Sequence, residues 1–524
     1  MSRLKRFTHA MISGYVLVGM NVVYTLASVP LALHYLTKEE FGLWALTSQI
    51  AGYLAMIDLG MGSSIARILI DVKDHRAGGC YGGVIKTGVL VSALQGGMVL
   101  AGGGVLVFFL AEFLQIPAKL AGNFFWLMVG QVVITAASFV SRMFAQVLSA
   151  WQRMDVSNYS AVVQLLVSLL VLWAGFSLGL GVMSLVAGLA VGWLVGAAIC
   201  AFACRHLGLL PQRGEWGDVS WVRARELFHF ATAVFLIALG TQLIMSSQTV
   251  LVSRLLGMEA AALWSVMTKI FTLSGQLVWR VIGNTQSAFA EMHVRREQDR
   301  LWKRYRALFV ATSVMAAVCG VFLVACNGPF VGLWTHGRFS WPVVNDVLLG
   351  LWLVVLTQQC CHSSLITCFK EIRGLKYVFL AEGIAVIGSV WVVLPRFGIT
   401  GMLICSLLAT LSFTWSYGTW RMTRLAGIVG WKNLLWDWQR PLFRVVGIMV
   451  PCWLVTEWTL RGAPDWLRLV INGALLTVIG MFVSLRFALP SDFITDMIGK
   501  LPLPLRRVAG FIVRRRHCGQ NTAA

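Results

Sequence analysis

Apolar runs of about 20 or more residues follow one another along the chain, the length that an α-helix needs to cross a bilayer. Strands of a membrane barrel would be shorter and would alternate apolar with polar residues. The pattern therefore predicts an all-α integral membrane protein with about fourteen transmembrane helices. The predicted spans are residues 11–35, 41–70, 84–114, 124–149, 159–178, 181–203, 228–256, 259–290, 305–334, 343–369, 377–394, 399–420, 442–460 and 466–489.

Composition agrees with this pattern and adds an orientation. Of the 524 residues, 58% are hydrophobic and 12% are charged, which leaves too few polar groups for a soluble surface of this size. Most of the 43 Lys and Arg residues gather in alternate connections, as they do on the cytoplasmic side of membrane proteins. We therefore expect both termini in the cytoplasm, and we assign the net charge of +21 to this bias rather than to nucleic-acid binding. The connections on the other side hold Lys38, Lys119, Arg254, Arg338, Arg396, Arg461 and Arg468.

An internal repeat predicts the architecture. A shift of 220 residues matches Leu36, Glu39, Leu43, Trp44 and Ile50 to Leu256, Glu259, Leu263, Trp264 and Ile270, and a shift of 218 matches Tyr159 to Tyr377. Two six-helix bundles related by a pseudo-twofold axis along the membrane normal would enclose a central cavity. The predicted parts are a first bundle (1–204), a cytoplasmic linker (205–227), a second bundle (228–424), two additional helices (425–489) and a basic cytoplasmic tail (490–524).

The span 259–290 carries two cations, which are costly inside a bilayer and usually face a bundle interior or a wet cavity. Polar residues recur there every three or four positions, so that on a helix they form one stripe. We interpret this span as a cavity-lining helix, with two alternatives for its cations: contact with a substrate, or pairing with Asp58 or Glu382. The stripe consists of Lys269, Thr272, Gln276, Arg280, Asn284 and Ser287.

Other polar residues inside spans allow a functional and a structural interpretation. Arg142 and Gln248 are further candidates for the cavity, although buried amides often serve as hydrogen bonds between helices. Asp58 and Glu382 are candidates for coupling or gating, while Asp58 could instead cap a helix that restarts after Gly60 and Gly62.

Two further groups favour packing, and the sequence contains no catalytic or metal-binding motif. His362 follows Cys360 and Cys361, but the group has too few ligands at suitable spacing for a closed metal site, so we expect these residues to serve helix packing. Close helix packing is predicted where glycines recur every four residues, at Gly188, Gly192 and Gly196.

Two stretches, Tyr35–Leu46 (YLTKEEFGLWAL) and Ile57–Arg67 (IDLGMGSSIAR), carry a family resemblance. The sequence resembles the polysaccharide and O-antigen flippases of the multidrug, oligosaccharidyl-lipid and polysaccharide exporter superfamily. The fourteen predicted spans and the repeat extend this resemblance over most of the chain. Members of this family often have a cationic central cavity, which Lys269, Arg280 and Arg142 would supply here.

The resemblance implies a transporter of the bacterial inner membrane rather than an enzyme. Its substrate would be an undecaprenyl-diphosphate-linked oligosaccharide for lipopolysaccharide, O-antigen or exopolysaccharide, moved by alternating access. Expected partners are this substrate, membrane lipids and other polysaccharide assembly proteins. No cofactor is expected, and coupling to Na⁺ or H⁺ stays open. The alternatives are a cation-coupled multidrug exporter of the same superfamily, disfavoured by the basic pair, and a membrane enzyme of polysaccharide assembly, disfavoured by the short far-side connections.

Overall fold

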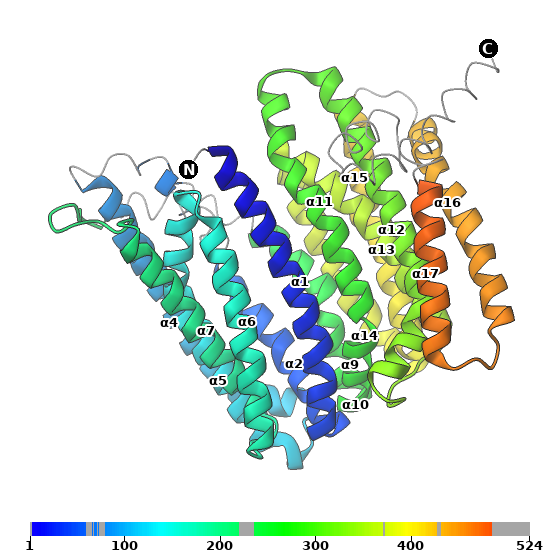
Figure 1. Cartoon of the computed structure of the whole chain (residues 1–524), viewed down its shortest axis with the longest axis horizontal. Helices are drawn as coiled ribbons and strands as arrows, with labels where there is room; N and C mark the ends of the chain where they lie inside the picture. The colour runs from blue at the N-terminus through cyan, green and yellow to red at the C-terminus, as the bar shows by residue number, and fades with distance from the viewer. Residues whose placement is uncertain are drawn as a thin grey trace. The chain divides into compact units, whose positions relative to one another are not determined.

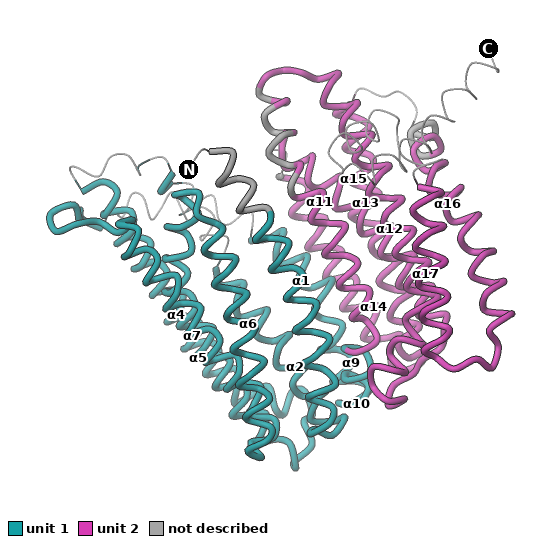
Figure 2. The backbone as a smooth tube through the Cα atoms, in the orientation of Figure 1, with its two compact units in different colours: residues 1–265 teal, residues 266–524 magenta. Residues whose placement is uncertain are grey.

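A computed structural model describes residues 3–58, 65, 68–70, 72, 79–219, 235–369, 372–426 and 431–484 (Figure 1). Every regular element within these residues is a helix. The chain divides into two compact units, Met1–Ser265 (unit 1) and Val266–Ala524 (unit 2), shown in Figure 2. The unit boundary falls inside α10 (Met258–Met267), whereas the repeat places the division in the linker 205–227. The domain boundaries derived from the repeat therefore stay predictions, and the basic tail 490–524 lies outside the described residues.

The predicted all-α membrane fold is confirmed, but the count of fourteen spans is not. Among the described residues, eleven helices are long and apolar enough to cross a membrane. One of them, Arg373–Leu425, covers two predicted spans. The predicted span 41–70 passes out of the described residues after Asp58. The predicted span 259–290 is interrupted at Thr268, between α10 and α11.

Unit 1 is a helix bundle in which α4, α5 and α7 pack side by side and α6 joins α1 to α7 (Figure 1). Long apolar helices of this kind satisfy their own backbone hydrogen bonds, which is what a bilayer demands. The elements of unit 1 are α1 (Arg3–Tyr35), α2 (Lys38–Ala55), η1 (Met56–Asp58), α4 (Cys80–Phe113), α5 (Ala118–Ala150), α6 (Met154–Ser177), α7 (Met183–His206), α9 (Ser247–Leu256) and most of α10.

Three glycines of α7 bring it close to α6. A Cβ atom added at Gly188 would lie 2.8 Å from the carbonyl oxygen of Ser168, and one added at Gly192 would lie 2.8 Å from that of Gln164. At Gly196 the same atom would meet the Gln164 side-chain oxygen at 2.8 Å. The predicted close packing at these three positions is confirmed, because larger side chains would push the backbones apart.

The starts of α2 and α10 correspond under the repeat and lie against each other within unit 1. Thr37 caps α2: its hydroxyl accepts from the Glu40 amide at 3.2 Å, and the Glu40 carboxylate accepts from the Thr37 amide at 2.9 Å. The first residues of the two helices, Lys38 and Met258, are separated by the repeat offset of 220. A Cβ atom on Gly42 would lie only 1.9 Å from the Met258 carbonyl oxygen, so only glycine fits at this crossing.

Unit 2 contains α11 (Lys269–Val294), α12 (Gln298–Trp334), α13 (Val343–Cys368), α14 (Ile372–Thr410), η2 (Leu411–Trp415), α15 (Ser416–Leu425), α16 (Trp431–Thr459) and α17 (Asp465–Val483). Helix α14 joins two predicted spans across a kink at Gly398. The φ of Gly398 is 62°, a region that glycine adopts readily and other residues rarely do. Pro395, just before the kink, has no amide hydrogen to donate to the helix.

His362 on α13 is buried in the core of unit 2. The hydroxyl of Tyr305 lies 2.8 Å from its Nδ1 atom, and the hydroxyl of Thr419 lies 3.4 Å from its Nε2 atom. The neighbouring Cys361 Sγ contacts the Thr312 hydroxyl at 3.2 Å. These partners agree with the packing interpretation of this segment, since buried polar groups are normally hydrogen-bonded.

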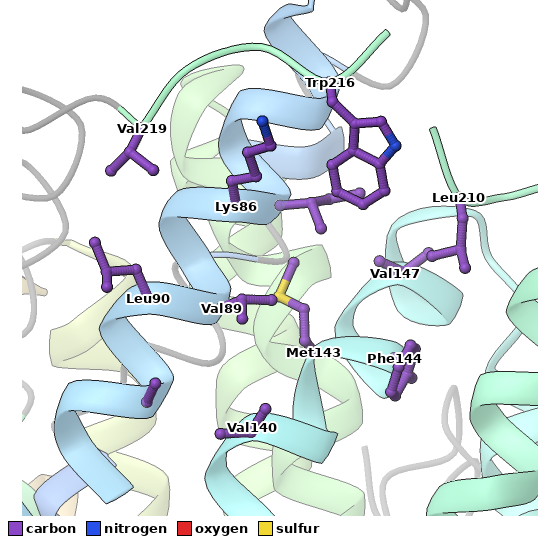
Figure 3. Close-up of a pocket in the computed structure, with 12 residues that line it drawn as sticks. Lys86, Val89, Leu90, Val140, Met143, Phe144, Val147, Leu210, Trp216 and Val219 are labelled. Carbon is purple, nitrogen blue, oxygen red and sulfur yellow. The ribbon is translucent and has the colours of Figure 1, made fainter. Parts of the chain in front are cut away.

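Unit 1 contains a pocket of about 570 Å³ between α4, α5 and the segment that follows α7 (Figure 3). Its walls are apolar except for one amine. The lining residues are Ile85, Lys86, Val89, Leu90 and Ala93 from α4, Val140, Met143, Phe144 and Val147 from α5, and Leu210, Trp216 and Val219 from the segment after α7.

Candidate functional site

Helix α11 has one packed face and one open face. On the packed face, Phe271 stacks on Trp352 of α13 with ring centroids 5.4 Å apart, and the Trp279 indole donates to the Thr357 hydroxyl at 3.2 Å. Val278 on this face is fully buried. These contacts fix the rotation of α11 about its axis, and hence the direction in which its polar stripe points.

The polar stripe of α11 lies mainly on the open face. Thr272, Gln276 and Arg280 are exposed, and Lys269 at the first turn is partly buried. Asn284 continues the stripe along the helix, but its side chain lies outside the described residues, as does that of Ser287. Three of the four stripe residues whose side chains are described are therefore exposed together, and the fourth, Lys269, is partly buried.

Within the described part of the chain, neither Lys269 nor Arg280 forms an ion pair. The two residues are eleven positions apart, so their Cα atoms are separated by about 16 Å along the helix axis. Because both side chains lie on one face of the helix, an extended anionic ligand can contact both of them. Lys269 would act as a point charge and Arg280 as a planar fork of donors. The described geometry thus offers an anion two separate positions along one helix.

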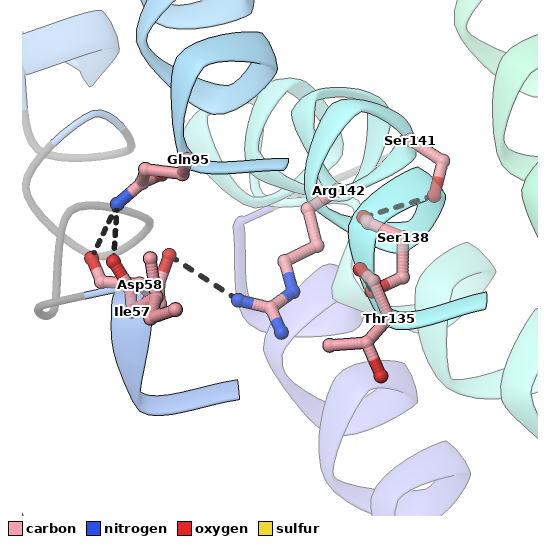
Figure 4. Close-up of polar contacts among 7 residues, drawn as sticks. All are labelled: Ile57, Asp58, Gln95, Thr135, Ser138, Ser141 and Arg142. Atoms are coloured by element: carbon pink, nitrogen blue, oxygen red, sulfur yellow. Dashed lines mark hydrogen bonds and ion pairs between the residues drawn. The ribbon is translucent and has the colours of Figure 1, made fainter. Parts of the chain in front are cut away.

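Asp58 pairs with Arg142 in unit 1 (Figure 4). The Arg142 Nη1 atom lies 3.2 Å from the Asp58 Oδ1 atom. The Arg142 guanidinium also lies over the Phe139 ring, 4.6 Å from its centroid. Two residues that the sequence singled out for different roles are therefore in contact. The capping role considered for Asp58 involves Gly60 and Gly62, which lie outside the described residues.

Gln95 holds the backbone around Asp58, and the sequence did not single it out. This buried side chain on α4 donates from Nε2 to the carbonyl oxygens of Ile57, at 2.8 Å, and Asp58, at 3.0 Å (Figure 4). Both carbonyl oxygens belong to the last two residues of η1. The sequence signal for Gln95 was an amide side chain inside an apolar span. Such a side chain does not by itself indicate its hydrogen-bond partner.

Glu382 is fully buried in unit 2 and has two donors. The Thr410 hydroxyl donates to its Oε1 atom at 2.8 Å, and the Thr414 amide donates to its Oε2 atom at 3.3 Å. Thr414 belongs to the π-helical turn η2, where a backbone amide is displaced from the regular α-helical pattern. Glu382 is thus bonded to α14 and η2 rather than to Lys269 or Arg280.

Gln248, the remaining cavity candidate, lies on α9 of unit 1 with 1% of its surface exposed. A ligand would reach this side chain only after the surrounding helices moved. Among the sequence candidates in unit 1, Asp58 and Arg142 therefore contact each other, whereas Gln248 is buried on α9.

Comparison with known families and structures identifies related proteins. The family model described as "Polysaccharide biosynthesis protein" matches residues 10–283, which is more than half of the chain. A search of curated proteins finds none that matches the sequence.

Several solved structures share the fold. An inward-facing multidrug resistance MATE family transporter of the MOP superfamily matches with a TM-score of 0.67 and 13% identity, over 80% of this chain and 99% of that one. The lipid II flippase MurJ, in an inward closed conformation, matches with a TM-score of 0.65 and 13% identity, over 93% and 99%. A MOP superfamily transporter from Pyrococcus furiosus, described as having a binding pocket of reverse polarity, matches with a TM-score of 0.57 and 15% identity, over 80% and 96%. At these identities the likeness establishes the fold alone, which this chain shares with the MATE transporter and with MurJ.

Proposed function

Because the chain belongs to the polysaccharide biosynthesis protein family, we propose that it is a flippase for a lipid-linked oligosaccharide. Its substrate is an oligosaccharide on undecaprenyl diphosphate, which it turns from the cytoplasmic to the periplasmic leaflet of the bacterial inner membrane. The likeness in fold to the lipid II flippase MurJ supports a lipid-linked substrate.

The observation that carries this proposal is the open polar face of α11. Lys269 and Arg280 have no ion-pair partner among the described residues, and Gln276 lies between them on the exposed side. A diphosphate-linked sugar must lose hydration to cross the bilayer, and fixed cations with amide donors replace that hydration. Asn284 of unit 2, and Arg142 and Gln248 of unit 1, stay candidates for further headgroup contacts.

Within this mechanism Asp58 has a gating role. Its carboxylate neutralises Arg142 at 3.2 Å, and both side chains are partly exposed, so an anionic headgroup could compete with Asp58 for the guanidinium. When the headgroup replaces the Asp58 carboxylate at Arg142, Asp58 is released. Substrate binding would in this way change the position of η1. The contacts of Glu382 with Thr410 and Thr414 instead support a structural role for that carboxylate.

The test is to neutralise both α11 cations in a strain whose surface polysaccharide depends on this protein. We expect the double variant Lys269→Gln/Arg280→Gln to lose surface polymer and to accumulate lipid-linked oligosaccharide in the inner membrane, at an unchanged protein level. The matched control is Lys303→Gln/Arg306→Gln, which removes two exposed cations from the first turns of α12. This control should leave the polymer unchanged.

Normal polymer in the α11 variant at normal protein level would exclude the cationic site. A loss of drug resistance without any change in surface polymer, on deletion of the protein, would favour the multidrug exporter instead. The charge-conserving variant Lys269→Arg/Arg280→Lys should retain part of the transport, since each position keeps its positive charge but changes its hydrogen-bond geometry.

A further inference from the structure

The pocket between α4 and α5 is lined almost entirely by hydrocarbon side chains. Met143 and Val147 of α5 form its buried floor, and Val89 and Leu90 of α4 form an exposed side (Figure 3). Its volume of about 570 Å³ lies within the range of roughly 300–1,000 Å³ found for small-molecule sites. A polar solute would find almost no hydrogen-bond partners there, so the walls select an apolar chain.

The segment after α7 forms the roof of the pocket and is held in place by contacts with α4. A Cβ atom on Gly82 would lie 2.3 Å from the carbonyl oxygen of Glu215, so the segment after α7 lies directly on the first turn of α4. The Tyr81 hydroxyl donates to the Leu209 carbonyl at 2.9 Å and accepts from the Trp151 indole at 2.9 Å. The roof is therefore attached to α4, and Tyr81 of α4 is bonded in turn to Trp151 at the end of α5.

The pocket opens on a face that a bilayer would cover. Val89, Leu90 and Val140 at its edge are all more than a third exposed. Large apolar side chains continue along α4 at Leu94 and Met98, each more than half exposed. Because α4 and α5 are both apolar enough to cross a membrane, this face meets lipid, and an occupant would enter from the bilayer.

One cationic side chain, that of Lys86, lies at the opening of the pocket. The Lys86 amine lies 6.0 Å from the centroid of the Trp216 ring, and within the described residues it forms no ion pair (Figure 3). Lys86 lies in the second turn of α4, which begins at Cys80, so its amine is near the end of the span. The sequence places this end on the cation-rich, cytoplasmic side. Lysine there can lay its stem along apolar walls and hold its amine at headgroup level.

We propose that this pocket binds an acyl chain of an anionic phospholipid of the inner leaflet, with the lipid phosphate against Lys86. The hydrocarbon walls take the chain, and the single amine at the mouth supplies the complementary charge. Trp216 beside the amine has the amphipathic character of residues that lie at a membrane interface. This lipid site is separate from the α11 stripe and does not depend on the transported substrate.

The test uses purified full-length protein in phosphatidylcholine vesicles that contain a phosphatidylglycerol with a photoreactive acyl chain. We expect labelling of peptides from residues 85–93 and 140–147. Val140→Trp fills the pocket and should lower this labelling, while Val133→Trp, at an exposed position of the same helix outside the pocket, should not. Leu90→Trp with Met98→Trp as its control repeats the comparison on α4, in case one variant fails to fold.

The role of the charge is tested separately. Lys86→Gln should lower labelling by phosphatidylglycerol about fivefold, as expected for the loss of one lysine near an anionic surface, and Lys86→Arg should retain it. A matched phosphatidylcholine probe should label the pocket weakly in every variant.

Three results would overturn the proposal. Labelling that is spread evenly over the exposed helices, or that falls equally with Val140→Trp and Val133→Trp, would mean that no lipid site exists here. Equal labelling by the phosphatidylcholine probe would show that the pocket does not select an anionic headgroup. Displacement of the probe by undecaprenyl phosphate, but not by unlabelled phosphatidylglycerol, would assign the pocket to the tail of the substrate.

Discussion

The Nη1 atom of Arg142 lies 3.2 Å from the Oδ1 atom of Asp58. This ion pair joins α5 to η1, two elements that α4 separates in the chain. The Asp58 side chain is 24% exposed and that of Arg142 36%. A pair with this exposure contributes about 0–1 kcal/mol to stability, so its main effect is to hold both charged groups in position.

Breaking this pair should impair transport more than stability. We expect Asp58→Asn and Arg142→Gln each to lower surface polysaccharide, and the double variant to lose little more than either single variant, because each change removes the same interaction. The measurements are surface polymer, protein level and the midpoint of thermal unfolding in detergent. Arg300→Gln, which breaks the exposed pair of Arg300 with Glu297 in unit 2, is the control. Fully additive losses would show that the two residues act independently.

Replacing Gln95 should destabilise the end of η1. Gln95→Leu leaves the Ile57 and Asp58 carbonyls without their side-chain donor, at a cost of about 1–3 kcal/mol. We expect a lower unfolding midpoint and reduced surface polymer. Gln131→Leu is a suitable control, since Gln131 on α5 is half-buried and forms no side-chain hydrogen bond with the described residues. Equal unfolding midpoints for the two variants would contradict the anchoring role of Gln95.

A larger side chain at Gly192 should separate α6 from α7. The Cβ of Gly192→Val would meet the Gln164 carbonyl oxygen at 2.8 Å, and overpacking of this kind costs about 1–3 kcal/mol. We expect lower expression and a lower unfolding midpoint. Gly97→Val on α4 is the control, because a Cβ atom at Gly97 has no neighbour within 4 Å. An unchanged midpoint for Gly192→Val would show that the helices can move apart at little cost.

Substitutions of Glu382 should distinguish a structural role of this carboxylate from a role in coupling transport to an ion. Glu382→Gln keeps an oxygen to accept from Thr410 or Thr414, so we expect transport to persist with modestly reduced stability. Glu382→Leu removes the acceptor of the buried Thr414 amide and leaves the Thr410 hydroxyl only the Ser406 carbonyl oxygen, so it should lower the protein level strongly. Surface polymer and protein level are measured together. If Glu382→Gln abolished transport at full protein level, the carboxylate itself would be required and a coupling role would follow.

Local patterns in the sequence were sufficient for the fold class and for the character of α11. Apolar runs of spanning length predict an all-α membrane protein because each helix satisfies its own backbone in a bilayer. Helical periodicity likewise predicts one polar stripe, and Thr272, Gln276 and Arg280 are exposed together in the structure. The glycine spacing on α7 predicted close packing for a similar reason, since every fourth residue lies on one face.

Contacts between helices were decided only by tertiary structure. The sequence offered Asp58 and Glu382 as partners for the α11 cations, but Asp58 pairs with Arg142, and Glu382 accepts from Thr410 and Thr414. Nothing in the local pattern marked Gln95, or the pocket that Lys86 borders. Periodicity shows which face of a helix is polar, because that depends on residues a few positions apart. The neighbour that meets this face depends on the rotation and register of distant helices, which packing of the whole bundle determines.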